Sequence, residues 1–301
     1  MNSDLQLLLL ALSIFSGVLF PSLAAWWQPL LPQIIFLLFV FAIVQIRFSD
    51  AYRTLQRNRN CWLILLWQLV LLPVLAAAIL YPLMSDQWYV FTLATLCTGS
   101  ITATTALSRL FGLNDALALV VCLGGALLMP LPLYVLLTFA VEGDASIDFA
   151  VYLTRIVVFI VVPFIVVFVF RKIASVQIDA WVREKVPHAV LILLVFFGLA
   201  VMDGVQTLLL ERPWLLLSYI ALAFGISIVV QGVTYIALSR LGIRDAKTAC
   251  LLCAYRNMGI VAAIAGASLG EHFLIFVGVW QLPMYLLPLF FKRFYREAEC
   301  N

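Results

Sequence analysis

Long apolar runs separated by short polar links constrain this 301-residue chain more than any other feature. Hydrophobic residues make up 65% of the chain and charged residues only 11%, more apolar surface than a soluble domain of this length needs. Because lipid offers no hydrogen-bond partners, such segments cross a bilayer as helices. Runs of spanning length fall at 5–23, 29–46, 61–83, 88–108, 114–140, 149–170, 188–204, 214–238, 247–269 and 271–291. We therefore expect an all-α membrane protein with ten transmembrane helices and a single polytopic membrane domain over residues 1–301.

The lysines and arginines are distributed unevenly over the predicted loops. With ten spans, both termini and every loop after an even-numbered span lie on one side of the membrane. Of the 18 lysines and arginines, Arg212 lies on the opposite side, Arg155 and Arg256 lie within spans, and the remaining 15 lie on the first side. Because cytoplasmic loops carry the excess of these residues, we expect both termini in the cytoplasm and the protein in the inner (cell) membrane. The net charge of +3 comes from these loops and does not indicate a nucleic-acid partner.

The first apolar run also resembles a signal peptide. Leu7 to Leu19 could be the apolar region, and Pro21 to Ala25 could contain a cleavage site with small residues. A signal peptide usually begins with lysine or arginine, whereas the first residues here carry Asp4 instead. We expect this run to be retained as a span.

Two of the runs have polar centres. Arg256 lies in the middle of 247–269, where an arginine costs roughly 2.5–3.5 kcal/mol on insertion scales and therefore indicates a function. Asn257 follows directly, and Gly259 is a place where the helix can open. The run 88–108 carries its own group of small and polar residues: Thr98, Gly99, Ser100, Thr102, Thr104, Thr105 and Ser108. Broken helices with polar groups at the membrane midplane form the substrate sites of many secondary transporters.

The polar interruptions recur at matching positions in the two halves of the chain. Five spans per half would place the halves in inverted orientation. Gln68, followed by Pro73, lies in the third span, and Gln231 lies in the eighth. A purely structural role for these residues stays open. Serine and threonine side chains can bond to carbonyl groups of their own helix, and a glutamine can form a hydrogen bond between two helices that contributes about 0.6 kcal/mol.

Four motifs follow one another along the chain: Phe48-Ser49-Asp50, Gln68 with Pro73, Thr104-Thr105 through Gly112 to Leu119, and Tyr255-Arg256-Asn257-Met258-Gly259. In order and spacing, these motifs resemble the bile acid:sodium symporter family over most of the chain. The resemblance implies two inverted five-helix repeats, with helices 4 and 9 unwound and crossing. It also implies panel helices at about 5–46 and 149–204, core helices at about 61–140 and 214–291, and alternating access by movement of one against the other.

The chain departs from that family where sodium would bind. Sodium-coupled members carry a glutamate four residues before a Gln-Asn pair on helix 9, and this chain has Leu252 and Arg256 at the glutamate and glutamine positions. A hard cation needs several oxygen ligands, which a leucine and a guanidinium cannot supply. The remaining candidate ion ligands are Gln68, Thr105, Asn257 and Gln231. We expect no metal or other cofactor, and sodium coupling that is weak or absent.

The expected function is therefore secondary transport of a small organic anion across the lipid bilayer. Arg256 would supply the positive charge that sodium supplies in relatives, and the site would be lined by Asn257, Thr104, Thr105, Gln68 and Ser100. A sodium-coupled anion symporter, an arsenite-type efflux permease with Cys97 as its metalloid contact, and a membrane sensor or partner-binding protein remain alternatives. We do not expect an enzyme, because histidine, serine and carboxylate groups do not converge at the midplane. Cys250 and Cys253 lack the second ligand pair of a zinc site.

Overall fold

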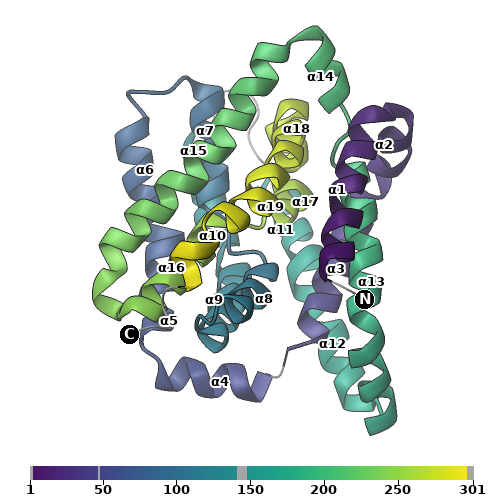
Figure 1. The fold of residues 1–301 in the computed structure, drawn as a ribbon, viewed down its shortest axis with the longest axis vertical. Coiled ribbons are helices and arrows are strands. Elements are labelled where there is room, and N and C mark those ends of the chain that lie inside the picture. The colour runs from purple at the N-terminus through teal and green to yellow at the C-terminus, as the bar shows by residue number, and fades with distance from the viewer. Residues whose placement is uncertain (1–2, 47, 141–147, 297–301) are drawn as a thin grey trace. The chain divides into compact units, whose positions relative to one another are not determined.

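The computed structural model describes residues 3–46, 48–140 and 148–296, and the regular elements in this part of the chain are helices (Figure 1). Within these residues, seven helical stretches are long and apolar enough to cross a membrane. They are Pro21–Val44, Asn60–Leu80, Asp115–Val135, Phe149–Ile173, Gln177–Glu211, Pro213–Leu241 and Glu271–Phe290. The chain is thus a multi-pass membrane protein, while the count of ten spans stays a prediction.

The three remaining predicted spans are shorter or interrupted for local reasons. The first corresponds to α1 (Ser3–Leu19), which ends before Pro21 begins the next helix. The fourth is divided into α7 (Asp86–Leu96) and α8 (Ala103–Leu110). The ninth is divided into α16 (Ile243–Ala254) and α17 (Met258–Leu269), where Tyr255 leaves the helical conformation at φ −102° and ψ 88°.

The chain divides into two compact units. The first unit comprises Met1–Ile46, Asp148–Ile220 and Ala262–Val279, and the second comprises Arg47–Ile147, Ala221–Val261 and Trp280–Asn301.

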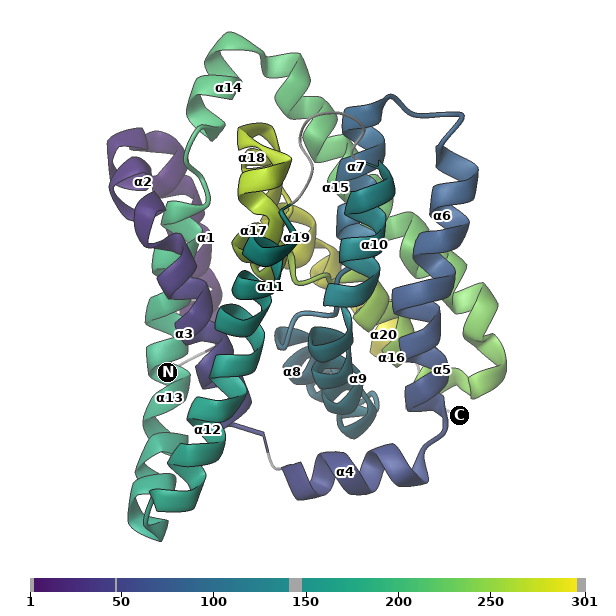
Figure 2. The same ribbon diagram turned by 180° about the vertical axis from the view of Figure 1, so that it is seen from behind.

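In the first unit, long helices pack side by side (Figures 1 and 2). α13 (Val176–Ala200) packs along α1 and α3 (Leu31–Val44), and α3 also contacts α12 (Val162–Ile173). A Cβ atom at Gly198 would lie 2.4 Å from Ser13 Oγ, so a larger residue there would displace the Ser13 hydroxyl where α13 meets α1. Small residues of this kind let membrane helices approach closely.

In the second unit, α9 (Asp115–Leu128) is the central helix. It contacts α4 (Phe48–Arg57), α5 (Asn60–Leu66), α8 and α16. Buried residues run along most of its length, and α8 and α16, one half of each interrupted span, pack against α9.

The third predicted span contains a wide turn. A π-helical turn, η2 (Trp67–Leu71), joins α5 to α6 (Leu72–Leu80). The Leu72 N–H bonds to the Trp67 carbonyl, and Pro73 has no N–H to offer to the turn before it. The Gln68 carbonyl therefore lacks the backbone donor that a regular helix would give it. π-turns of this kind are frequent at functional sites.

Candidate functional site

The two interruptions cross each other inside the second unit. Ser100 and Arg256 form an antiparallel β-bridge, in which the Ile101 N–H donates to the Tyr255 carbonyl at 3.0 Å and the Asn257 N–H donates to the Gly99 carbonyl at 2.9 Å. Backbone groups at the break in each span therefore form hydrogen bonds with backbone groups at the break in the other. Without such pairing, each break would leave polar groups unsatisfied in the apolar interior of a membrane domain.

Arg256 lies buried in this crossing, with only 1% of its surface exposed. Its Nη1 donates to the Thr98 carbonyl at 2.7 Å and lies 3.4 Å from the Gln68 carbonyl. Thr98 follows the end of α7, where carbonyl groups lack helical donors and carry partial negative charge. The positive charge is thus held by carbonyl oxygens at a helix end and at the π-turn.

Gln68 and Ser100 connect the π-turn to both interrupted spans. Gln68 Nε2 donates to Ser100 Oγ at 2.9 Å and approaches the Thr98 carbonyl at 3.4 Å. Ser100 Oγ in turn donates to the Leu252 carbonyl at 2.9 Å, in the last turn of α16. Of the predicted residues, Gln68, Ser100 and Arg256 therefore meet in one buried hydrogen-bonded group, to which we refer as the crossing network.

Thr104 and Thr105 lie at the start of α8, beside a thiol. Thr104 Oγ1 donates to the Ile101 carbonyl at 2.6 Å and lies 3.0 Å from Cys122 Sγ, while Thr105 Oγ1 lies 3.9 Å from the same sulfur. Cys122, and not the Cys97 of the arsenite alternative, is the cysteine that contacts these threonines. Thr104 is buried, whereas Thr105 keeps some exposed surface.

Asn257 begins the second half of the ninth predicted span. Its Oδ1 accepts a hydrogen bond from the Ile260 N–H at 3.4 Å, in the first turn of α17. The side chain is partly exposed. Asn257 and Thr105 are thus the two predicted site residues that combine a polar side chain with accessible surface next to the crossing.

Gln231, a predicted ion ligand, has its hydrogen bonds elsewhere. Its Nε2 donates to the Ser227 carbonyl at 3.2 Å, and its Oε1 accepts from the Tyr295 hydroxyl at 2.6 Å. The structure therefore places Gln231 with the C-terminal end of the described chain. The role of Tyr295 was not found from sequence, where it follows the last span and looks like a tail residue.

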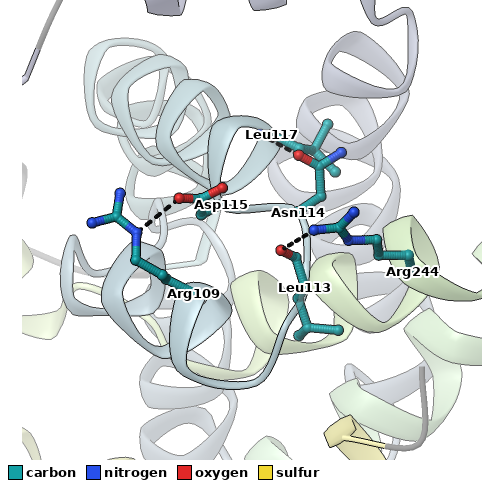
Figure 3. Close-up of polar contacts among 6 residues, drawn as sticks. All are labelled: Arg109, Leu113, Asn114, Asp115, Leu117 and Arg244. Carbon is teal, nitrogen blue, oxygen red and sulfur yellow. Dashed lines mark hydrogen bonds and ion pairs between the residues drawn. The ribbon is translucent and has the colours of Figure 1, made fainter. Parts of the chain in front are cut away.

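A second polar group lies where α8 leads into α9 and α16 begins (Figure 3). Asn114 Oδ1 accepts from the Leu117 N–H at 3.1 Å and so caps α9, while Arg244 Nη2 donates to the Leu113 carbonyl at 3.1 Å. Asn114 Nδ2 also donates to Asp245 at 2.8 Å, which ties the start of α9 to the first turn of α16. The exposed pair Arg109 and Asp115, 2.9 Å apart, lies on the same link. These contacts join the C-terminal end of α8 and the N-terminal end of α16 to the start of α9.

Two glycines allow the crossing to approach α9. A Cβ atom at Gly99 would lie 2.7 Å from the Gly125 backbone carbon, and one at Gly125 would lie 3.2 Å from Gly99 Cα. The first distance is shorter than any van der Waals contact, and its partner is backbone that cannot rotate away. The crossing thus requires glycine at position 99. Gly125 was not predicted as part of the site; the adjacent pair Gly124-Gly125 is the signal in the sequence that could have indicated it.

Comparison with known proteins assigns the chain to a family. The model of the SBF-like CPA transporter family matches residues 4–290, which is nearly the whole chain. None of the curated proteins compared with the chain is similar enough to count as a match. The matched family is bile acid:sodium symporter-like, in agreement with the resemblance seen in the motifs. With its apolar spans and its paired helix breaks, the chain belongs to the SBF-like CPA transporter family and is a membrane transporter.

Proposed function

We propose that this protein is a secondary transporter of a small organic anion, which works by alternating access without obligatory sodium coupling. The observation that carries the proposal is Arg256, a buried guanidinium at the crossing of two interrupted helices. We further propose ten helices in two inverted five-helix repeats, in which the pairs α7–α8 and α16–α17 are the fourth and ninth.

The electrostatics of the crossing favour an anion. α8 begins at Ala103 and α17 at Met258, and helix N-termini carry partial positive charge. Arg256 adds a full charge that its side chain cannot lose, because an arginine stays protonated in proteins. We propose that the anion binds beside Asn257 and Thr105, with Thr104, Gln68 and Ser100 supporting the site from inside. Arg256 would act on the anion through a medium of low dielectric, where a charge is felt more strongly than in water.

The same geometry argues against a sodium requirement. The carbonyl oxygens of Thr98 and Gln68 are ligands of the kind that a hard cation takes, and Arg256 Nη1 already donates to both. Leu252, at the position of the carboxylate in sodium-coupled relatives, is fully buried. We propose that the Arg256 guanidinium supplies the positive charge that a bound ion would otherwise supply. We also propose that Gln231 supports the fold and does not bind an ion.

The proposed site can be tested by ligand-dependent thermal stability of the purified protein. A panel of small carboxylates, sulfonates and phosphates should include at least one that raises the melting temperature in a concentration-dependent way, because a ligand that binds only the native state stabilises it. The response should be the same in sodium and in potassium buffer. Neutral and cationic analogues of the active compounds serve as controls. Stabilisation by cations alone would remove the anion assignment.

The two compact units suggest how the panel and core helices divide. We propose that the panel comes from the first unit and the core from the second. The helices expected in the panel, about 5–46 and 149–204, fall in the first unit, and those of the core at about 61–140 fall in the second. Of the expected core at about 214–291, residues 221–261 and 280–291 fall in the second unit, whereas 214–220 and 262–279 fall in the first unit.

We also propose that both termini face the cytoplasm in the inner membrane. Single cysteines introduced at Arg53 or Lys185, in a background without the six native cysteines, should be shielded from impermeant thiol reagents in intact cells. A cysteine at Gly143, which lies outside the described residues, should label readily. Labelling in the reverse pattern would contradict both the orientation and the ten-span topology. Permeabilised cells, in which all three positions should react, provide the control.

A further inference from the structure

The last described helix, α20 (Lys292–Arg296), is docked into the second unit although it follows the final apolar run. Tyr295 is fully buried, and its ring stacks on Phe111 with centroids 5.3 Å apart and planes inclined by 15°. Its hydroxyl donates to Gln231 Oε1 at 2.6 Å. Burial raises the pKa of Tyr295, so the phenol stays protonated and remains a donor at physiological pH. This residue is therefore fixed by stacking and by a hydrogen bond.

A buried lysine ties α20 to the first half of the broken ninth span. Lys247, on α16, is only 5% exposed. Its ammonium group donates to the Phe294 carbonyl and lies 4.8 Å from the centroid of the Phe294 ring. A buried ammonium needs partners of this kind to compensate for lost water. Lys247 thus gives α16 and α20 a contact that both would lose if α20 moved away.

The docked helix reaches the residue that begins the helix break. Tyr295 belongs to a buried cluster with Leu251, Ala254 and Tyr255. Tyr255 is the residue whose carbonyl accepts the Ile101 N–H in the crossing, and it directly precedes Arg256. Any change that lets Tyr255 move will therefore loosen the Ser100–Arg256 bridge.

We propose that α20 stabilises the transport site from within the chain, a role that we call the prop. In this role Tyr295 is a positioning residue that holds Tyr255, and through it Arg256, in the crossing. The part of this inference that concerns transport rests on the proposed function. The part that concerns the stability of the crossing does not.

Hydrogen exchange at the crossing tests the prop without any ligand. In Tyr295→Ala, the amides of Ile101 and Asn257 should exchange at least tenfold faster than in the parent protein, because the bridge opens more often. Tyr295→Phe keeps the ring stacking and loses the bond to Gln231, so it should give a smaller increase. Phe290→Ala is the matched control, since Phe290 is an aromatic residue at the end of α19 (Gln281–Phe290) with 76% of its surface exposed. Unchanged exchange in Tyr295→Ala would overturn the prop.

Two further measurements keep the result interpretable. If Tyr295→Ala does not fold, Lys247→Met becomes the test, because it removes the amine tie and leaves the Tyr295 stacking in place. It should also speed exchange at Ile101 and Asn257, and unchanged rates would overturn the prop. Anion-induced stabilisation, measured on the same variants, should weaken at least tenfold in apparent affinity for Tyr295→Ala and be retained in Phe290→Ala. Faster exchange in a protein whose parent binds no anion would support the prop and reject the proposed function.

Discussion

Replacing Arg256 by glutamine is expected to abolish stabilisation by the anion. Glutamine is shorter and uncharged, so the Thr98 and Gln68 carbonyls lose their donor and the site loses its fixed positive charge. Hydrogen bonds to a charged group contribute about 1.5–3 kcal/mol, which is partly offset because the buried charge no longer has to be desolvated. We therefore expect folded protein in the membrane with little change in basal melting temperature. The measurement is ligand-induced thermal stabilisation of the purified variant and of its parent.

Two variants control this result. Arg256→Lys keeps the charge but loses the planar fork of donors, so it should bind the anion more weakly than the parent and more strongly than Arg256→Gln. Arg155→Gln removes the other arginine predicted within a span, whose Nη1 donates to the Ile264 carbonyl at 3.1 Å in the first unit. It should keep the anion response. Unchanged binding in Arg256→Gln would mean that the arginine only pins the broken helix, and the anion assignment would have to be dropped.

Replacing Gly99 by alanine is expected to damage both stability and transport. The new methyl group would lie 2.7 Å from backbone of Gly125 and 2.9 Å from the Ala126 nitrogen, so the segment that pairs with Arg256 must shift away from α9. Overpacking of this kind costs about 1–3 kcal/mol. The melting temperature of the purified protein and its anion response should both fall.

Gly232→Ala provides the matched control for this substitution. Gly232 lies in α15 (Pro213–Leu238), where a Cβ atom would meet nothing within 4 Å. Because alanine is favoured over glycine by about 0.5–1 kcal/mol inside a helix, this variant should be as stable as the parent or slightly more stable. Equal stability of Gly99→Ala and Gly232→Ala would contradict the close contact between the crossing and α9.

Sequence reasoning could locate the interruptions because they break a strong apolar pattern. Arg256 and the serine and threonine residues near position 100 are conspicuous within apolar runs, and the structure interrupts both runs at these residues. The pairing of Ser100 with Arg256 could not be derived in this way, because it joins segments far apart in the chain. Nor could the π-turn at Gln68, which depends on how Pro73 changes the hydrogen bonds of the turn before it.

The supporting residues were missed for a different reason. Lys247 lies at the first position of the ninth predicted span and Tyr295 lies after the tenth, where a charge or a lone aromatic residue gives no sign of burial. Their burial depends on the docking of α20, which no local pattern indicates. Gln231 stays a predicted ion ligand, and no local pattern reveals its hydrogen bond with Tyr295, because the two residues lie 64 positions apart in the chain.

Uptake into proteoliposomes tests the central claim most directly. The anion that stabilises the purified protein best would be supplied outside vesicles in sodium buffer or in potassium buffer, with Arg256→Gln vesicles as the inactive control. We expect saturable uptake that changes less than tenfold between the two buffers and is lost in the Arg256→Gln vesicles. Uptake with a steep, sigmoidal dependence on sodium would contradict the role of Arg256 as the fixed cation of the site.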